Sequence, residues 1–312
     1  MKSLVTGGAG FIGSHLTKRL VDLGHDVVVL DNLKRGNKID KDILEQIQLF
    51  PCDIRNADSV MMAAKGCDYI FHFAAVLGVD IVADNPVETM ETEVIGMQNV
   101  VKSAIHHKCS KIIYASTSGV YGKTAIQNAV NEEFDGSPKS SYSISKRYNE
   151  IYLRSLFDER NLQSSSLRFF NVYGPKQDNR MVIPRFFEQA LHNKPVTVYG
   201  SGKQTRDFTY IDDVIEAIIR VADRVPGCEI INVSNNCENS INSLAKEIIE
   251  LTGSKSKIQY VLPSENRYDF EVERRFGSSK KLHRLVGFCP STPFKEGLNE
   301  TYRWILKNYQ KD

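Results

Sequence analysis

The first half of the chain alternates short apolar runs with segments whose apolar residues recur at helical spacing. The apolar runs predict strands, which lie at about 3–6, 26–30, 47–50, 69–73, 111–115 and 163–169. The segments between them predict helices, with clear examples at about 57–64, 87–107 and 142–160. Because the strand interiors are continuously apolar, helices should cover both faces of the sheet. The pattern therefore predicts an α/β fold with a doubly wound parallel sheet.

The pattern loosens after Asn171, although three further helices are predicted, at about 182–192, 212–223 and 240–251. We therefore expect a sheet domain at 1–172 and a smaller, interleaved C-terminal substrate domain at 173–312. The segment at about 205–230 should pack back on the first domain, because it contains a helix with an apolar face.

A cluster of glycines follows the first predicted strand. Gly7, Gly10 and Gly13 are three residues apart and lead into a segment with helical periodicity. Glycines allow a tight strand-to-helix turn, close approach of the backbone to a ligand and close packing of helix on strand. The helix N-terminus adds unpaired N–H groups that suit a pyrophosphate. A turn without a ligand would need only the glycines, whereas strand, spacing and helix together indicate a Rossmann-type dinucleotide-binding domain.

The second predicted strand ends in Asp31, about twenty residues after the glycines, where such domains carry an acid. A carboxylate at that place accepts hydrogen bonds from the ribose hydroxyls and repels a 2′-phosphate. The sequence therefore favours NAD over NADP. Lys34 and Arg35 follow closely, and they are either solvated loop charges or cations that soften this preference.

Polar and small residues also follow the other predicted strands. They are Asp53, Ala74-Ala75, Ser116–Ser118 and Asn171. Ligands of open α/β sheets bind beyond the carboxyl ends of the strands. We therefore expect one large cleft across the first domain.

Composition narrows the possible partners. The chain has 312 residues, and its net charge of +2 gives no electrostatic case for nucleic acid or an anionic membrane. Its apolar runs are far shorter than the ~18 residues that span a bilayer. A first strand near Ser3 leaves no room for a signal peptide, and the six scattered cysteines show no metal-type spacing. We therefore expect a cytoplasmic protein with reduced thiols and no metal site.

A candidate catalytic pair opens the helix predicted at 142–160. Tyr142 and Lys146 are four residues apart and share one helical face. A phenol ionises near pH 10, and a nearby ammonium lowers that value, which would make Tyr142 a general base for an alcohol. Ser116 and Thr117 could hold the alcohol oxygen. Alone, the pair is typical of an exposed helix surface; beside a dinucleotide fingerprint, it favours catalysis.

Together, these residues resemble the extended short-chain dehydrogenases. The similar segments run from residue 2 to about residue 305 and include VTGGAGFIGSH, Asp31, Asp53–Arg55, Phe71–Ala75, Ser116–Ser118, Tyr142–Lys146 and Arg168–Pro175. Within that group, the chain is similar to NAD-dependent nucleotide-sugar epimerases and dehydratases of the UDP-glucose (UDP-galactose or UDP-N-acetylglucosamine) 4-epimerase type. This resemblance implies bound NAD and a nucleotide-sugar substrate.

The resemblance also implies roles for matching residues. Tyr142 would be the base, Lys146 would bind the nicotinamide ribose and tune the tyrosine, and Thr117 would hydrogen-bond the sugar oxygen. The other residues expected to contact NAD are Gly7, Gly10, Phe11, Ile12, Gly13, Asp31, Asn32, Asp53, Ile54, Ala74, Ala75, Asn99 and Ser116. The residues expected to contact the nucleotide sugar are Thr117, Ser118, Tyr142, Asn171, Arg206 and Arg267.

The two arginines of that set suit a diphosphate, which favours guanidinium forks. Arg206 matches the family position that grips the substrate diphosphate; the alternative is a salt bridge to Asp207 or Asp212. Arg267 falls where a second such arginine occurs in the family, and an ordinary loop arginine is the alternative.

The segment 274–280 departs from the family pattern. Gly277 stands where the family carries aspartate, and Arg274 stands at a position that limits the bulk of an N-acetyl group. An arginine there indicates a shifted register, a different sugar or direct contact with an anion. It leaves open a uronic acid or a different nucleotide.

Three residues after the fifth predicted strand bear on the reaction. This chain has Thr117, Ser118 and Gly119 at these positions. The family's 4,6-dehydratases carry Thr-Asp-Glu there. Its decarboxylases keep the glutamate at the last position, which is Gly119 in this chain. Without those carboxylates, nothing at this place can move the extra protons that either reaction requires. We therefore expect a 4-epimerase of UDP-glucose/UDP-galactose or of their N-acetyl forms, acting through a 4-keto sugar.

Other activities fit part of the pattern. A UDP-glucuronate 4-epimerase or another nucleotide-sugar oxidoreductase, such as a 4-ketoreductase, would use the same tyrosine and lysine. A non-catalytic dinucleotide sensor would use only the fold.

The helices at 87–107 and 142–160 match the pair that builds a four-helix dimer interface in the family. Their apolar stripes predict a homodimer, although stripes that face their own sheet would look the same.

Overall fold

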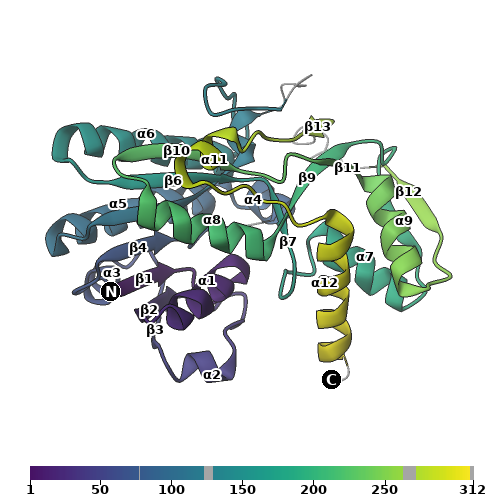
Figure 1. Ribbon diagram of the computed structural model, residues 1–312, viewed down its shortest axis with the longest axis horizontal. Helices are drawn as coiled ribbons and strands as arrows, with labels where there is room; N and C mark the ends of the chain where they lie inside the picture. Colours follow the sequence, from purple (N-terminus) through teal and green to yellow (C-terminus); the bar gives the residue numbers. More distant parts are fainter. Residues whose placement is uncertain (77, 123–128, 263–271, 310–312) are drawn as a thin grey trace.

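The computed structural model describes residues 1–312 except 77, 123–128, 263–271 and 310–312 (Figure 1). Its main element is a seven-stranded sheet in the order β10-β6-β5-β4-β1-β2-β3, in which all neighbouring strands are parallel. These strands are β1 (Lys2–Thr6), β2 (Asp26–Asp31), β3 (Gln48–Pro51), β4 (Tyr69–His72), β5 (Lys111–Thr117), β6 (Ser164–Phe169) and β10 (Cys228–Val233).

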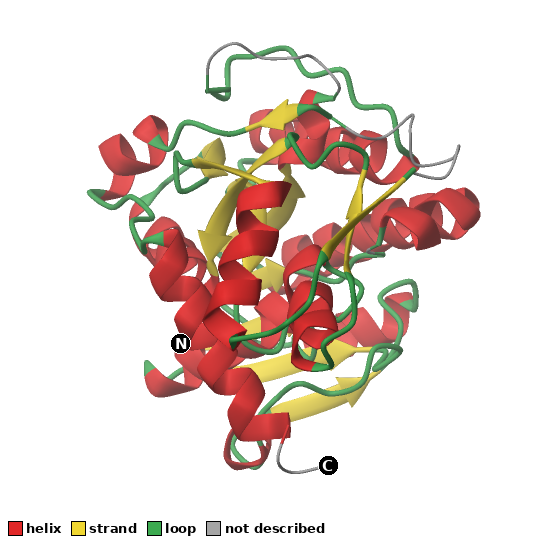
Figure 2. Ribbon diagram, turned by 90° about the vertical axis from the view of Figure 1, so that its right-hand side faces the viewer, coloured by secondary structure: helices red, strands yellow, loops and turns green. Residues whose placement is uncertain are grey.

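Helices cover both faces of this sheet, as Figures 1 and 2 show. One face carries α3 (Ala57–Ala63), α5 (Pro86–His107) and α6 (Ser141–Arg160), and the other carries α1 (Phe11–Asp22) and α8 (Ile211–Arg224). Successive residues of a strand point to opposite faces. Leu4 therefore packs on the side of α5, whereas Val5 packs on the side of α1. The doubly wound, Rossmann-type fold predicted from the sequence is confirmed.

The second half of the chain adds a smaller sheet, seen on the right of Figure 1. Its central strand is β9 (Thr205–Tyr210), which pairs with β7 (Asn171–Tyr173), β11 (Glu238–Ser240) and β13 (Arg274–Arg275). A separate pair is formed by β8 (Val196–Tyr199) and β12 (Ile258–Val261). The helices here are α7 (Val182–Leu191), α9 (Ile241–Thr252), α11 (Lys280–Val286) and α12 (Phe294–Tyr309); short turns of helix elsewhere are α2 (Lys41–Leu44), α4 (Val79–Asp84) and η1 (Ser118–Tyr121).

The two halves of the chain are interleaved. Strand β10 pairs with β6 at the edge of the main sheet, and α8 packs against α1. The second half therefore supplies one strand and one covering helix to the first. We propose a domain division into 1–172 and 173–312, with a segment at about 205–230 that returns to the first domain.

The predicted helices agree closely with the observed ones. Each of the six lies within one residue of its predicted ends. The short strands β7, β11 and β13 were not indicated, because two or three residues carry no periodic signal.

Three features of the described residues concern the expectations about membranes, metal ions and cysteines. No helix among the described residues has the length and apolarity needed to cross a membrane. In the same residues, no cluster of three or more histidine, cysteine, aspartate or glutamate side chains could hold a metal ion. All six cysteines are free thiols.

Candidate functional site

The glycine loop lets β1, β4 and α1 approach one another closely. Gly7 has a positive φ of 70°, and a Cβ on it would lie 2.6 Å from the amide nitrogen of Ala74. A Cβ on Gly13 would lie 2.1 Å from the carbonyl oxygen of Gly7. Gly10 begins α1 without a side-chain cap. The first N–H groups of α1 therefore remain available to an anionic ligand.

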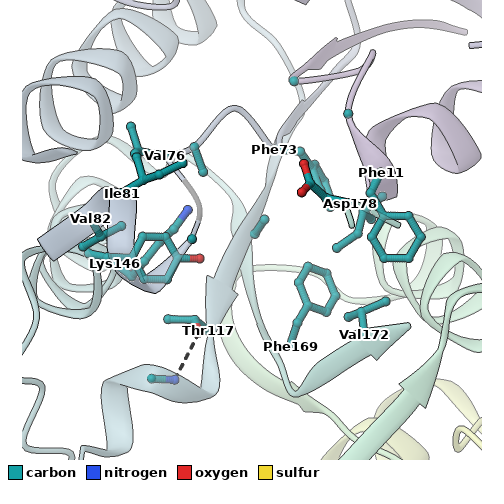
Figure 3. A pocket seen from close by; sticks show the side chains of 18 of the residues that line it. Phe11, Phe73, Val76, Ile81, Val82, Thr117, Lys146, Phe169, Val172 and Asp178 are labelled. Carbon is teal, nitrogen blue, oxygen red and sulfur yellow. Dashed lines mark hydrogen bonds between the residues drawn. The ribbon is translucent and has the colours of Figure 1, made fainter. Parts of the chain in front are cut away.

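The carboxyl ends of the central strands open into a cavity of about 920 Å³. Figure 3 shows Thr117 and Lys146 on one side of it, with Phe11, Phe169 and Asp178 on the other. The predicted site residues that line this cavity are Gly7, Gly10, Phe11, Ile12, Gly13, Asp31, Asn32, Asp53, Ile54, Ala74, Ala75, Ser116, Thr117, Ser118, Tyr142, Lys146 and Asn171. The structure thus brings residues from seven separate segments to one place.

Two predicted residues lie outside the lining, and a third lies outside the described residues. Asn99 donates from Nδ2 to the carbonyl oxygens of Ile54 (3.1 Å) and Arg55 (3.0 Å), so it holds a cavity wall from behind. Arg206 donates from Nη1 to the carbonyl oxygens of Thr205 (2.8 Å) and Val272 (2.6 Å). Arg267 belongs to 263–271, outside the described part of the chain.

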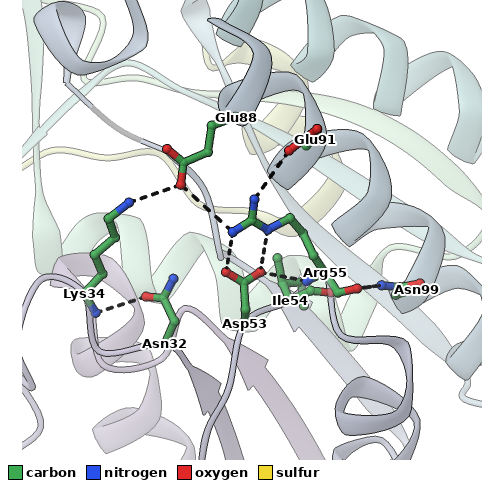
Figure 4. Close-up of polar contacts among 8 residues, drawn as sticks. All are labelled: Asn32, Lys34, Asp53, Ile54, Arg55, Glu88, Glu91 and Asn99. Carbon is green, nitrogen blue, oxygen red and sulfur yellow. Dashed lines mark hydrogen bonds and ion pairs between the residues drawn. The ribbon is translucent and has the colours of Figure 1, made fainter. Parts of the chain in front are cut away.

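A network of charges surrounds Asp53 at one end of the cavity (Figure 4). Arg55 donates to both carboxylate oxygens of Asp53 at 2.9 Å, which holds the pKa of that carboxyl below its usual value. Arg55 also lies 3.5 Å from Glu91, and Lys34 pairs with Glu88 at 3.1 Å. The charge of Lys34, one of the two cations that follow Asp31, is therefore balanced inside this network.

Asp31 is held by the backbone on both sides. Its Oδ2 accepts from the amide of Ala9 (3.0 Å) and its Oδ1 from the amide of Leu33 (2.8 Å). Burial raises the pKa of Asp31, and these two hydrogen bonds oppose that shift. The carboxylate is thereby fixed at the end of β2, where it lines the cavity. Arg35, the second of the two cations, also lines the cavity.

The candidate catalytic residues meet at the end of β5. Tyr142 lies in the first turn of α6, which Ser140 caps, and it hydrogen-bonds with Thr117. Nζ of Lys146 lies 5.4 Å from the ring centroid of Tyr142. The expected lowering of the pKa of Tyr142 by Lys146 is not what the structure shows. Burial raises the pKa well above the usual value, and the carboxylate of Glu93 raises it further.

Glu93 was not among the predicted site residues. It lies on α5, where Oε2 is 3.0 Å from Nζ of Lys146, and both side chains are buried. A sequence signal existed, because Glu93 shares one helical face with the buried Met97 and Val100. A charged residue on such an apolar stripe indicates a buried ionic partner.

Ser116 anchors β5 to α6 rather than pointing freely into the cavity. Its Oγ donates to Oε1 of Glu150 at 2.6 Å. Arg168 of β6 donates to both oxygens of Glu150 at 2.8 Å. This buried trio fixes the helix that carries Tyr142 against the ends of two strands.

The arginine that reaches the cavity from β13 is Arg275, not Arg274. Arg274 pairs with Glu238, its Nη2 lying 2.6 Å from Oε2, and it is absent from the cavity lining. Arg275 lines the cavity, and its Nη2 donates to the carbonyl oxygen of Gly122 at 3.3 Å. Its Nε is buried without a hydrogen-bond partner among the described residues. Burial and the nearby Arg206 lower the pKa of Arg275 to about 10.

The departure at Gly277 has a steric reason. A Cβ at this position would lie 2.4 Å from the ring of Phe170. The amide of Gly277 instead points toward Oδ2 of the buried Asp207, at 3.4 Å. An aspartate at 277 would therefore displace the aromatic ring that packs there.

The sequence profile of the NAD dependent epimerase/dehydratase family matches residues 3–234. The chain belongs to this family. It is 37% identical to the UDP-N-acetyl-alpha-D-glucosaminuronate decarboxylase of Bacillus cytotoxicus, over 97% of both chains. The structure resembles UDP-glucose 4-epimerase of Thermotoga maritima with UDP-glucose, with a TM-score of 0.93 and 30% identity over 99% of this chain and 100% of that one. It also resembles UDP-glucose 4-epimerase of Thermus thermophilus in complex with NAD, with a TM-score of 0.90 and 31% identity over 98% and 99%.

The cofactor of the family is NAD, and the residues present fit it. The close packing at Gly7 and Gly13 brings the N-terminus of α1 against β1 and β4 at the cavity, where a pyrophosphate would bind. The uncapped N-terminus of α1 offers N–H donors, and Asp31 offers a carboxylate to the ribose. Lys146 lines the same cavity as Asp53 of the charge network.

We expect Asp31→Asn to weaken the discrimination against NADP. Loss of the negative charge removes the repulsion of a 2′-phosphate, so the ratio of the Kd values for NADP and NAD should fall by about tenfold or more. Isothermal titration of both cofactors measures this ratio. Asp53→Asn is the matched control, because Arg55 already balances the charge of Asp53; it should change both affinities by a similar factor. An unchanged ratio in Asp31→Asn would contradict the assignment.

Proposed function

We propose that the protein is a 4-epimerase of a UDP-sugar, with UDP-glucose/UDP-galactose or UDP-GlcNAc/UDP-GalNAc as substrates. The observation that carries this proposal is the convergence of Thr117, Tyr142 and Lys146 at a part of the cavity whose described lining holds no acid. Among the described residues that line the cavity, the carboxylates are Asp31, Asp53, Glu88 and Asp178. The first three belong to the other end of the cavity, and Asp178 lies across it and pairs with Arg180.

The side chains suit reversible oxidation at a carbinol carbon. As the phenolate, a form that the positive charge of bound NAD+ would favour, Tyr142 accepts the proton of the sugar hydroxyl, and Thr117 holds the same sugar oxygen. Bound NAD supplies the acceptor for the hydride and returns it. When the keto sugar presents its other face, Tyr142 gives the proton back, and the configuration at C4 is inverted.

Elimination and decarboxylation are less well supported by these residues. Ser118 and Gly119 occupy the positions where a carboxylic acid and its partner would be needed, and both line the cavity. The serine hydroxyl does not ionise at neutral pH and the glycine has no side chain, so neither residue can move a second proton. We therefore attribute the similarity to a decarboxylase to membership of the same family and do not infer the same reaction from it.

A UDP-glucuronate 4-epimerase is our second candidate. The observation that favours it is the guanidinium of Arg275, which lines the cavity without a carboxylate partner among the described residues. A buried guanidinium binds carboxylates through strong, charge-assisted hydrogen bonds. A uronic acid would supply such a group.

We further propose a homodimer that forms through α5 and α6, which pack against each other. Ile144, Tyr148 and Ile151 lie along one face of α6 and are 43%, 41% and 56% exposed. On α5, Ile95 is 40% exposed. Exposed apolar residues at this density mark contact surfaces.

A cytoplasmic location agrees with the free thiols of all six cysteines.

The epimerase proposal is tested by incubating the purified protein with UDP-galactose and with UDP-N-acetylgalactosamine and detecting the 4-epimers by NMR. Tyr142→Phe should lower kcat by about 10²–10⁴-fold, because the general base is removed. Its affinity for NAD should stay within a small factor of the wild type. Tyr148→Phe, on the same helix but exposed, should keep normal activity. Absence of any 4-epimer from these substrates in the wild type would refute the proposal.

The second candidate makes a separate prediction for Arg275→Met. If a uronate carboxylate binds Arg275, this variant should raise KM for UDP-glucuronate by about 10–100-fold, as loss of a charged hydrogen bond implies, and leave KM for UDP-glucose nearly unchanged. Steady-state kinetics with both substrates measures the effect. Arg274→Met is the control, since Arg274 lies outside the cavity lining. Equal effects on both substrates would argue against the uronate.

The dimer proposal predicts that Ile151→Glu yields a monomer, because a buried unpaired carboxylate opposes association. Sedimentation velocity distinguishes the two masses. Leu306→Glu places the same charge on α12, at a residue that is 41% exposed, and should leave the dimer intact. A monomeric wild-type protein would rule the proposal out.

A further inference from the structure

A buried ion pair connects α5 to the helix that carries Tyr142. Oε2 of Glu93 lies 3.0 Å from Nζ of Lys146, and the two side chains are 0% and 1% exposed. Burying either charge alone is costly, whereas a close pair offsets much of that cost. Each charge therefore depends on the other for its presence inside the protein.

The ammonium of this pair faces two tyrosine rings. Its nitrogen lies 4.7 Å from the ring centroid of Tyr114 and 5.4 Å from that of Tyr142. Asn149 links the same groups, since its Nδ2 donates to the carbonyl oxygen of Glu93 (3.1 Å) and to the hydroxyl of Tyr114 (2.9 Å). Residues from α5, β5 and α6 thus surround the ammonium of Lys146.

The phenol of Tyr142 responds to groups from several elements. Burial raises its pKa, and the charge of Glu93 on α5 raises it further. The hydrogen bond with Thr117 of β5 and the charge of Arg35 in the loop after β2 lower it. The charge of Lys146 would lower it too, but Glu93 balances that charge at a distance of 3.0 Å.

Two other titratable groups around the pair, His72 and Tyr114, are neutral near pH 7, and the charge of Glu150, which also acts on Tyr114, is paired with Arg168. His72 of β4 stacks on Tyr114 at 5.6 Å, and burial, with a smaller contribution from Lys146, lowers its pKa to about 3. Burial raises the pKa of Tyr114 well above its usual value. Burial also raises the pKa of Glu93, which the ion pair with Lys146 opposes. The charges near Tyr142 are therefore those of Glu93, Lys146 and Arg35.

We propose that Glu93 is a positioning residue that neutralises Lys146 and thereby cancels the effect of the ammonium on the phenol of Tyr142 in the cofactor-free protein. Glu93 acts through Lys146, because it does not line the cavity itself. The catalytic meaning of this role of Glu93 rests on the proposed function, because both concern Tyr142. The test of the role uses no sugar nucleotide, so it can fail while the proposed epimerase activity holds, and the reverse.

The test is a spectroscopic titration of tyrosinate in the folded protein, with the contribution of Tyr142 obtained by subtracting the matching Tyr142→Phe protein. Glu93→Gln preserves the shape of the side chain but leaves the ammonium unbalanced. Tyr142 of the wild type should give no tyrosinate signal while the protein stays folded, whereas in Glu93→Gln its ionisation should move about 1–3 pH units lower and become visible before unfolding. Glu93→Asp retains the charge and should give no such signal, like the wild type. Glu159→Gln, an exposed change on α6, is the control and should shift nothing.

Equal titration of Tyr142 in the wild type and in folded Glu93→Gln would overturn the proposal. If Glu93→Gln does not fold, the double variant Glu93→Gln/Lys146→Met, which leaves no buried charge unpaired, takes its place in the same titration. Because this variant has neither the carboxylate nor the ammonium, its Tyr142 should titrate as in the wild type. A signal of Tyr142 at a lower pH in this variant would also overturn the proposal.

Discussion

The close approach of β1, β4 and α1 is the constraint on which the whole site depends. It exists only because Gly7 and Gly13 lack a Cβ, which would collide with neighbouring backbone at 2.6 and 2.1 Å. This contact fixes the N-terminus of α1 at the carboxyl edge of the sheet. A pyrophosphate then has a defined place at that N-terminus. Residues at the ends of β2 and β5 would contact the two nucleotide halves on either side of it.

Charge is distributed unevenly along the cavity. At one end, Asp53 and Arg55 belong to a balanced network that holds its position without a ligand. In the middle, the reactive phenol of Tyr142 sits beside a neutral pair, Glu93 and Lys146. Farther along, Arg275 presents a guanidinium whose Nε has no partner among the described residues. Among these groups, Arg275 is therefore the one that can pair with an anionic part of a ligand.

Local patterns in the sequence predicted the sheet and its helices, and most of the predicted site residues line the cavity. Tyr142 and Lys146 were predictable because helical spacing alone places them together. Glu93 was missed because its partner is 53 positions away and on another helix, a pairing that only packing reveals. Arg275 was missed for a different reason: the two-residue strand β13 decides which of two adjacent arginines faces the cavity, and such a short segment has no periodicity.

The position of β10 has a consequence for synthesis of the chain. This strand covers the edge of β6, yet about sixty residues separate the two in sequence. While the ribosome adds those residues, β6 presents unpaired backbone groups that can recruit another strand. The interleaving that unites the two halves of the mature protein thus leaves the nascent chain exposed to mispairing until β10, the last strand of the main sheet, has emerged.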